Sequence, residues 1–157
     1  MKIAVVGLGK IGLPLAVQYA SKGHDVIGVD VNALTVESVN RGEEPFPGEA
    51  HLAERLASAV ADGRLRATVD YSAAVPTAHV IVVVVPLFVD TAGAPDFELM
   101  DGATLSIAAN LTADTVVIYE TTLPVGTTRG RWAPALERGS GLAAGSDFHV
   151  VFPRNEC

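Results

Sequence analysis

Three glycines lie close together near the start of the chain, in the stretch Gly7-Leu8-Gly9-Lys10-Ile11-Gly12. This G-x-G-x-x-G pattern is common in ordinary turns, so its context decides its meaning. An apolar run from Lys2 to Val6 precedes it and predicts a buried strand, and Ile11 to Tyr19 places apolar residues at helical spacing after it. A glycine turn between a strand and a helix is typical of a dinucleotide-binding unit.

Each glycine has a separate role in such a unit. Gly7 permits the tight turn, Gly9 lets the backbone approach a pyrophosphate, and Gly12 lets the helix lie close to the sheet. The start of the helix then offers unpaired amides and the positive end of its dipole to the anion. The alternative is that these glycines only shape a turn.

A carboxylate follows at the expected distance. Asp30 ends a second predicted strand, Asp25 to Val29, and stands 18 residues beyond Gly12. It can accept hydrogen bonds from the ribose hydroxyls of an adenosine. A 2′-phosphate would face this carboxylate, and no arginine occurs at residues 31–35, so we expect NAD rather than NADP as the cofactor. In the alternative interpretation Asp30 only caps the next helix.

A second polar block, Glu120-Thr121-Thr122-Leu123-Pro124-Val125-Gly126-Thr127-Thr128, follows another predicted strand. Ligands of doubly wound sheets lie outside the carboxyl ends of the strands, so Thr122 is expected to face the nicotinamide end of the cofactor. Its hydroxyl is suited to orienting a water or the reacting sugar, although threonine is a poor acid or base. Alternatively, the threonines form a turn whose hydroxyls cap a helix beginning near Thr127.

Other chemistries lack a matching pattern. The chain has no G-x-x-x-x-G-K-[ST] motif for phosphate binding. Its acidic group Asp96, Glu98 and Asp101 is interpreted as negative charge at the start of a helix rather than as a paired acid and base. Because no histidine has a partner four residues away on a helix, we expect no metal site; the histidines are His24, His51, His79 and His149.

Composition bounds the class of protein. A chain of 157 residues with 49% apolar residues fits one packed domain. With 18 acidic against 11 basic residues and a net charge of −7, nucleic acid is not an expected partner. The apolar run from Val80 to Val89 is too short to cross a bilayer, so no membrane span is expected. A single cysteine, Cys157, excludes an internal disulfide and suggests a reducing, cytoplasmic location.

Apolar runs of strand length alternate with stretches of helical spacing, which is typical of βαβ units. We predict strands at Lys2–Val6, Asp25–Val29, Arg66–Val69, Val80–Val85, Thr115–Tyr119 and Phe148–Phe152. We predict helices at Ile11–Tyr19, Leu34–Val39, His51–Val60, Leu99–Leu111 and Thr127–Leu136, the last broken by Pro134, and a loop at Pro86–Pro95. The expected fold is α/β, a doubly wound Rossmann fold with a mostly parallel six-stranded sheet and helices on both faces, in one domain over residues 1–157.

Taken together, five blocks of the chain resemble the N-terminal, NAD-binding domain of the UDP-glucose/GDP-mannose dehydrogenase family, which includes UDP-N-acetylmannosamine dehydrogenases. The blocks are residues 6–14 (VGLGKIGLP), 29–32 (VDVN), 39–45 (VNRGEEP), 93–97 (GAPDF) and 120–128 (ETTLPVGTT). The resemblance implies a two-step oxidation of a nucleotide sugar's C6 alcohol to a carboxylate, with two NAD reduced. It also implies that the backbone around Lys10 and Ile11 contacts the pyrophosphate, and that Thr122 contacts the cofactor and helps to position a catalytic water.

Two departures from the family pattern matter. The family usually has a threonine after the proline of the fourth-strand loop, whereas this chain reads Pro86-Leu87-Phe88. Family members continue the last strand into a Ser-Pro-Glu-Arg segment with a catalytic glutamate, whereas this chain reads Phe152-Pro153-Arg154-Asn155-Glu156-Cys157. Cys157 has no Gly-Gly before it and is interpreted as a stray terminal residue, not as the family's catalytic cysteine.

We therefore expect the cofactor-binding part of a nucleotide-sugar dehydrogenase, truncated or fragmentary and not catalytic alone. The resemblance implies that the family's central and C-terminal domains are absent from this chain, so a nucleotide sugar would be a partner only together with those domains. Full-length relatives are expected to form homodimers. Two other interpretations stay open. One is a stand-alone NAD(H)-binding regulatory module. The other is a β-hydroxyacid-type dehydrogenase domain, against which the block from Glu120 to Thr128 speaks.

Overall fold

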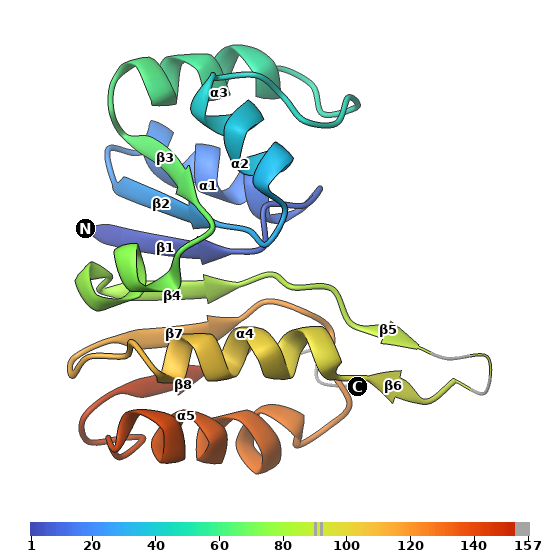
Figure 1. Ribbon diagram of the computed structural model, residues 1–157, viewed down its shortest axis with the longest axis vertical. Coiled ribbons are helices and arrows are strands. Elements are labelled where there is room, and N and C mark those ends of the chain that lie inside the picture. Colours follow the sequence, from blue (N-terminus) through green and yellow to red (C-terminus); the bar gives the residue numbers. More distant parts are fainter. Residues whose placement is uncertain (90, 92, 153–157) are drawn as a thin grey trace.

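The computed structural model describes residues 1–89, 91 and 93–152. Six strands form one sheet in the order β3-β2-β1-β4-β7-β8, and every neighbouring pair is parallel (Figure 1). These strands are β1 (Lys2–Val6), β2 (Asp25–Val29), β3 (Leu65–Thr68), β4 (Val80–Val83), β7 (Val116–Tyr119) and β8 (His149–Val151). This order is that of a doubly wound Rossmann sheet, so the predicted fold class is confirmed.

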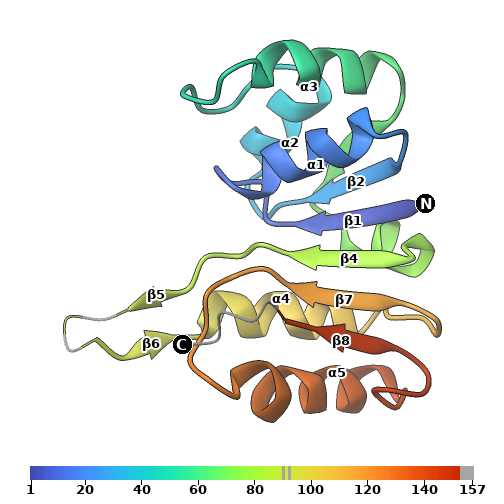
Figure 2. The same ribbon diagram turned by 180° about the vertical axis from the view of Figure 1, so that it is seen from behind.

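Helices cover both faces of the sheet. They are α1 (Gly12–Ser21), α2 (Ala33–Asn40), α3 (Leu52–Ala61), α4 (Glu98–Ala108) and α5 (Ala133–Ser140). From β1 the chain proceeds one way across the sheet to β3, and from β4 it proceeds the other way to β8. Because crossovers between parallel strands are right-handed, the two directions place their helices on opposite faces. Figure 2 accordingly shows α1 in front of the sheet and α4 behind it.

Two separate hydrophobic cores result. One joins β1, β2 and β3 to α1, α2 and α3 and includes the fully buried Leu8, Leu13 and Leu56. The other joins the sheet to α4 and α5 and includes Ile81 and Ile107. The first core therefore holds the glycine turn against the sheet, since Leu8 belongs to that turn.

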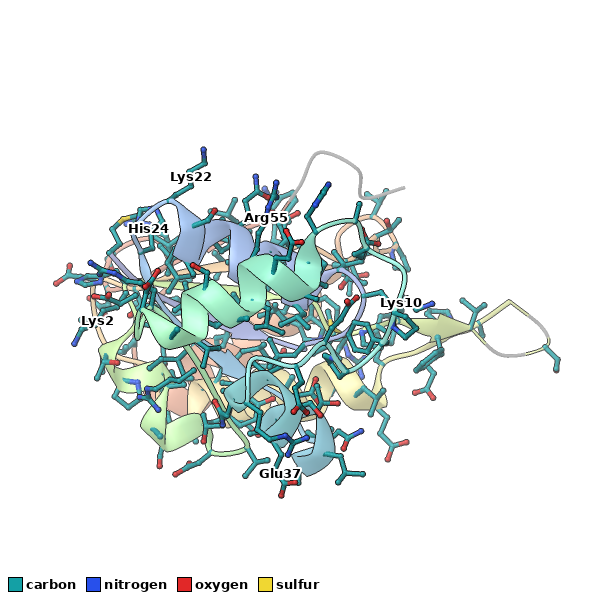
Figure 3. All side chains as sticks on the ribbon, turned by 90° about the horizontal axis from the view of Figure 1, so that it is seen from above. Lys2, Lys10, Lys22, His24, Glu37 and Arg55 are labelled. Atoms are coloured by element: carbon teal, nitrogen blue, oxygen red, sulfur yellow. The ribbon has the colours of Figure 1, made fainter. Side chains whose placement is uncertain are left out.

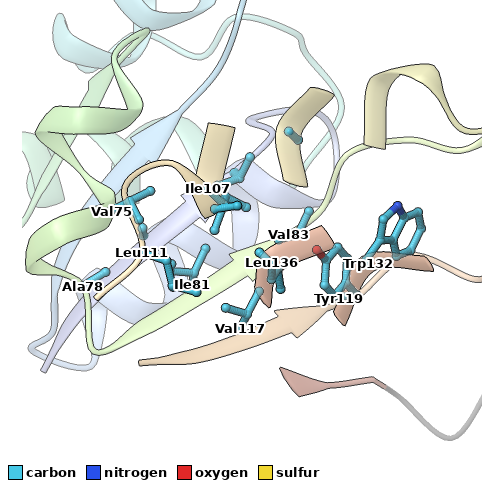
Figure 4. Close-up of a cluster of buried hydrophobic side chains, with 14 of the residues drawn as sticks. Val75, Ala78, Ile81, Val83, Ile107, Leu111, Val117, Tyr119, Trp132 and Leu136 are labelled. Atoms are coloured by element: carbon cyan, nitrogen blue, oxygen red, sulfur yellow. The ribbon is translucent and has the colours of Figure 1, made fainter. Parts of the chain in front are cut away.

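The second core contains the aromatic rings of Tyr119 and Trp132 beside many aliphatic side chains (Figure 4). Tyr119 of β7 stacks on Trp132 with ring centroids 4.8 Å apart, and its buried hydroxyl lies 2.8 Å from the hydroxyl of Thr104 on α4. Burial raises the pKa of Tyr119. Asp101 accepts hydrogen bonds from Arg131 and from the indole N–H of Trp132, and the bond from Arg131 is the main cause of its lowered pKa. These contacts tie α4 to the segment that leads into α5.

The predicted strand Val80–Val85 is shorter in the structure, where β4 ends at Val83. Val83 lies opposite Val6 of β1 and Tyr119 of β7, which are the last residues of those strands. A strand cannot extend beyond both of its partners without losing the ladder hydrogen bonds. The apolar composition of residues 80–85 therefore predicted too long a strand, because the lengths of β1 and β7 limit that of β4.

Pro134 does not break a helix, contrary to the prediction. The chain makes a π-helical turn at Thr128–Trp132, and Pro134 then lies in the first turn of α5. Proline is tolerated there because the amides of a first turn have no partner within the helix.

Two connections were not predicted. Within the predicted loop Pro86–Pro95, β5 (Phe88–Val89) and β6 (Pro95–Asp96) pair as an antiparallel hairpin that projects from the end of the sheet. The crossover from β3 to β4 uses two 3₁₀ turns, Tyr71–Ala73 and Val75–Thr77, in place of an α-helix. None of the helices in the described ranges has the length and apolar character needed to span a membrane.

A strained backbone position yields a stability prediction. His51, the residue before α3, has a φ of 61°, in the left-handed region that favours glycine. We expect His51→Gly to stabilise the chain by roughly 0.5 kcal/mol, since the strain relieved exceeds the added entropy of the unfolded state. The lost contact with Glu54 joins two exposed side chains 3.8 Å apart and contributes little.

Urea unfolding measures this difference. His51→Ala keeps a Cβ in the same left-handed conformation and serves as the matched control, which should show no gain. Equal stabilities for the two variants would contradict the prediction.

Candidate dinucleotide-binding site

The residues singled out in the sequence meet at the carboxyl edge of the sheet. The glycine turn follows β1, Asp30 follows β2, and Thr122 follows β7, all at the end from which the hairpin projects (Figure 1). The direction of winding reverses between β1 and β4, and ligands of doubly wound sheets bind outside the strand ends at this point. The glycine turn lies directly at the reversal.

The three glycines differ in what a side chain would meet. Gly7 has a φ of +93°, and a Cβ there would lie 2.9 Å from the carbonyl oxygen of Val84. At Gly12 a Cβ would lie 1.8 Å from the carbonyl oxygen of Gly7, which no side chain can satisfy. At Gly9 a Cβ would meet nothing within 4 Å. Two glycines are thus required by the protein's own packing, and the third faces open space.

The start of α1 is left open to an anion. No side chain in the described part of the chain caps this helix, and no acidic residue occurs in its first turn. Lys10 and Ile11 are exposed, and Ile11 keeps 64% of its accessible surface. Figure 3 shows Lys10 at the end of the molecule that carries the hairpin, whereas Lys2 and His24 lie at the opposite end. Because the first turn of α1 carries no acidic side chain, its start can receive the negative charge of an anion.

Asp30 is held beside the glycine turn by backbone hydrogen bonds. Its Oδ2 accepts the N–H of Leu8 at 2.8 Å, and its Oδ1 accepts the N–H of Asn32 at 2.9 Å. The cap of α2 is Asn32, whose side chain accepts the N–H of Leu34, so the interpretation of Asp30 as only a helix cap is wrong. Each carboxylate oxygen retains acceptor capacity for a ribose hydroxyl.

Apolar and aromatic side chains around Asp30 were not anticipated. Val31, directly after Asp30, and Leu34, in the first turn of α2, keep 84% and 72% of their accessible surface. Tyr71, in the crossover after β3, has a raised pKa because of burial and, to a smaller extent, because of the negative charge of Asp30. The exposed apolar residues directly after Asp30 were the available signal, since they can contact a flat base.

Thr122 is exposed and follows β7, a strand that lies two strand spacings, about 10 Å, from β1. Its neighbour Thr121 is partly buried and donates a hydrogen bond to the carbonyl oxygen of Val85 at 2.8 Å, which joins this block to the end of β4. The hydroxyl of Thr127 donates to the carbonyl oxygen of Pro124 and does not cap the following helix, so the capping interpretation fails at that residue. The role of Thr122 itself stays a prediction.

Two other expectations concern the ends of this site. Leu87, where the family usually has a threonine, packs against the second hydrophobic core and offers no hydroxyl. Residues 153–157, including Cys157, lie outside the described residues.

The packing of the glycines predicts two different failures. Gly12→Ala should destabilise the chain by roughly 1–3 kcal/mol, because its Cβ collides with backbone that cannot retreat. Gly9→Ala should leave stability nearly unchanged and should weaken NADH binding, because its methyl group enters the space open to the phosphates. Urea unfolding and titration with NADH separate the two effects. Normal NADH affinity in Gly9→Ala would contradict this placement of the phosphates.

Comparison with known proteins gives the family. The model of the UDP-glucose/GDP-mannose dehydrogenase family, NAD binding domain, matches residues 1–153. The UDP-N-acetyl-D-mannosamine dehydrogenase of Pyrococcus horikoshii is 36% identical over 153 residues, which are 96% of this chain and 35% of the relative. The enzyme of the same name from Salmonella typhi is 39% identical over 152 residues, which are 97% of this chain and 33% of the relative.

Solved structures agree. The GDP-mannose dehydrogenase of Pseudomonas aeruginosa superposes with a TM-score of 0.91 at 30% identity, over 96% of this chain and 35% of that one. A diketoreductase, at a TM-score of 0.62 and 19% identity, shares the fold alone. The chain spans about a third of the length of the curated relatives it matches. Because the family model accounts for residues 1–153, the chain belongs to the UDP-glucose/GDP-mannose dehydrogenase family, whose NAD-binding domain it represents.

Proposed function

We propose that the chain binds NAD along the carboxyl edge of the sheet and supplies the cofactor-binding part of a nucleotide-sugar 6-dehydrogenase. The start of α1 carries the proposal, since its amides lack a side-chain cap and Gly9 leaves the approach to them open. The diphosphate would lie on this turn, with backbone contacts from Lys10 and Ile11. The adenosine ribose would lie at Asp30, and the base against Val31 and Leu34.

The nicotinamide would extend from the glycine turn toward Thr122. When bound, NAD supplies a hydride acceptor. Thr122 can donate or accept a hydrogen bond at the reacting end, which suits it to orient a water or the sugar rather than to transfer a proton. In the complete reaction an alcohol, water and two NAD⁺ would give a carboxylate, two NADH and three protons. The carboxylate product requires both oxidation steps.

Sugar recognition and the remaining catalytic groups would be supplied by those parts of the full-length relatives that the match with this chain does not cover. Its relatives are about three times as long, so roughly two thirds of each lies outside the comparison. We therefore infer that the 157-residue chain binds the cofactor without turning over a nucleotide sugar. We also infer a cytoplasmic location, because the single cysteine leaves no internal disulfide, and a homodimeric state for the full-length enzyme.

Calorimetric titration with NADH and NADPH tests cofactor binding. We expect NADH to bind and NADPH to bind at least about tenfold more weakly, because its 2′-phosphate would lie beside the Asp30 carboxylate, and a tenfold ratio needs only about 1.4 kcal/mol. Incubation with NAD and UDP-glucose, UDP-N-acetylmannosamine or GDP-mannose should give no rise in absorbance at the NADH wavelength. Absence of NADH binding would refute the cofactor assignment, whereas sugar oxidation by the chain alone would refute only its inactivity.

A further inference from the structure

The residue between the first two glycines is the anchor of the turn. Leu8 is fully buried, whereas the neighbouring Gly9 and Lys10 are exposed. Its side chain lies directly over Gly28, the next-to-last residue of β2, since a Cβ at Gly28 would be 2.7 Å from both methyl carbons of Leu8. A glycine inside a strand often marks such a close approach. A methyl group at Gly28 would therefore require the buried Leu8 side chain to shift.

The backbone of the same turn is tied to the end of the same strand. The N–H of Gly7 donates to the carbonyl oxygen of Val29 at 2.8 Å, and the N–H of Leu8 donates to Asp30 Oδ2 at 2.8 Å. Asp30 is in turn held by the N–H of Asn32. Three consecutive residues of β2 and its end, 28–30, therefore fix the position of Gly7 and Leu8.

The residues after Leu8 have no comparable anchorage. A Cβ at Gly9 would touch nothing, and the side chains of Lys10 and Ile11 face solvent. Gly9, Lys10 and Ile11 directly precede α1, which begins at Gly12. Their position follows from Leu8 on one side and from the contact of Gly12 with Gly7 on the other. Fixing amides before a ligand arrives reduces the entropy lost on binding.

We propose that Leu8, Gly28 and Asp30 are positioning residues for the diphosphate. The Leu8 side chain packs on Gly28, and the Asp30 carboxylate accepts the hydrogen bond of the Leu8 amide. Asp30 then affects the binding of the phosphate groups through the Leu8 amide, in addition to any contact that it makes with the ribose. This inference rests on the proposed binding of NAD. It implies that replacing Asp30 to admit a 2′-phosphate also weakens the diphosphate site.

A ligand without ribose hydroxyls separates the two roles of Asp30. ADP and 2′,3′-dideoxyadenosine 5′-diphosphate are titrated into the wild-type chain and into Asp30→Ala and Asp30→Asn. We expect Asp30→Ala to weaken the dideoxy ligand at least about fivefold. Asp30→Asn should recover part of this loss, because its amide oxygen can still accept the Leu8 N–H. A carboxylate that served only the ribose would leave the dideoxy affinity of Asp30→Ala unchanged, and this result would overturn the inference.

A double-mutant cycle tests the packing of Leu8 on Gly28. Gly28→Ala should displace Leu8 and weaken the dideoxy ligand at least about fivefold. Leu8→Ala combined with Gly28→Ala should bind more tightly than Gly28→Ala alone, since the smaller side chain frees the space that the new methyl group needs. If the effects of Leu8→Ala and Gly28→Ala on the affinity for the dideoxy ligand simply added, this would contradict the proposed role of the contact between the two residues. If Gly28→Ala fails to fold, the Asp30 titrations decide by themselves.

Controls distinguish positioning from general loss of stability. Ile107→Val, in the core on the opposite face of the sheet, should lower the urea midpoint and leave the affinity for both ligands unchanged. A wild-type chain that binds neither NADH nor ADP would refute the proposed function itself. A wild-type chain that binds ADP but not the dideoxy ligand would refute this inference alone, because ribose contacts would then carry the binding.

Discussion

The contact between Gly12 and the carbonyl oxygen of Gly7 is the constraint on which the rest of the site depends. A Cβ at Gly12 would lie 1.8 Å from that oxygen, so α1 can start at the end of β1 only because this position carries no side chain. The close start places the helix amides at the carboxyl edge of the sheet and seats Leu13, Ala16 and Val17 in the first core. One backbone contact thus serves both the packing of α1 and the placement of its positive end.

The topology of the sheet gives this edge its length. β1 lies between β2 and β4, and the winding direction reverses between β1 and β4, so the connections that leave these two strands turn to opposite faces of the sheet. The ends of β2, β1, β4 and β7 lie side by side at this edge. Asp30 marks one end of this row and Thr122 the other. A dinucleotide is an extended molecule with two sugars, and a row of strand ends about 5 Å apart provides contacts for each of its parts.

Most of the fold followed from patterns along the chain. The alternation of apolar runs with stretches of helical spacing predicted the six strands of the main sheet and a mostly parallel arrangement. The continuous run of valine and isoleucine at β4 indicated a strand buried on both faces. Where the predicted bounds of an element were wrong, contacts with neighbouring segments of the chain set the observed bounds. β4 ends at Val83 because its partners end there, Pro134 begins α5 because a π-helical turn precedes it, and the hairpin after β4 has only two residues in each strand. None of these features can be predicted from a local pattern of residues.

The candidate site divides in the same way. By itself the sequence determined which groups were available: the amides of a glycine turn, a carboxylate 18 residues later and a threonine block after another strand, since residue type and spacing are properties of the chain. Only the tertiary structure decided that Leu8 lies buried over Gly28, that Asp30 accepts the Leu8 N–H, and that Asn32 rather than Asp30 caps α2. The physical reason is that the Leu8 contacts join β1 to β2 across about 20 residues, and their distances are set by strand register and close packing, which act only after the sheet has formed.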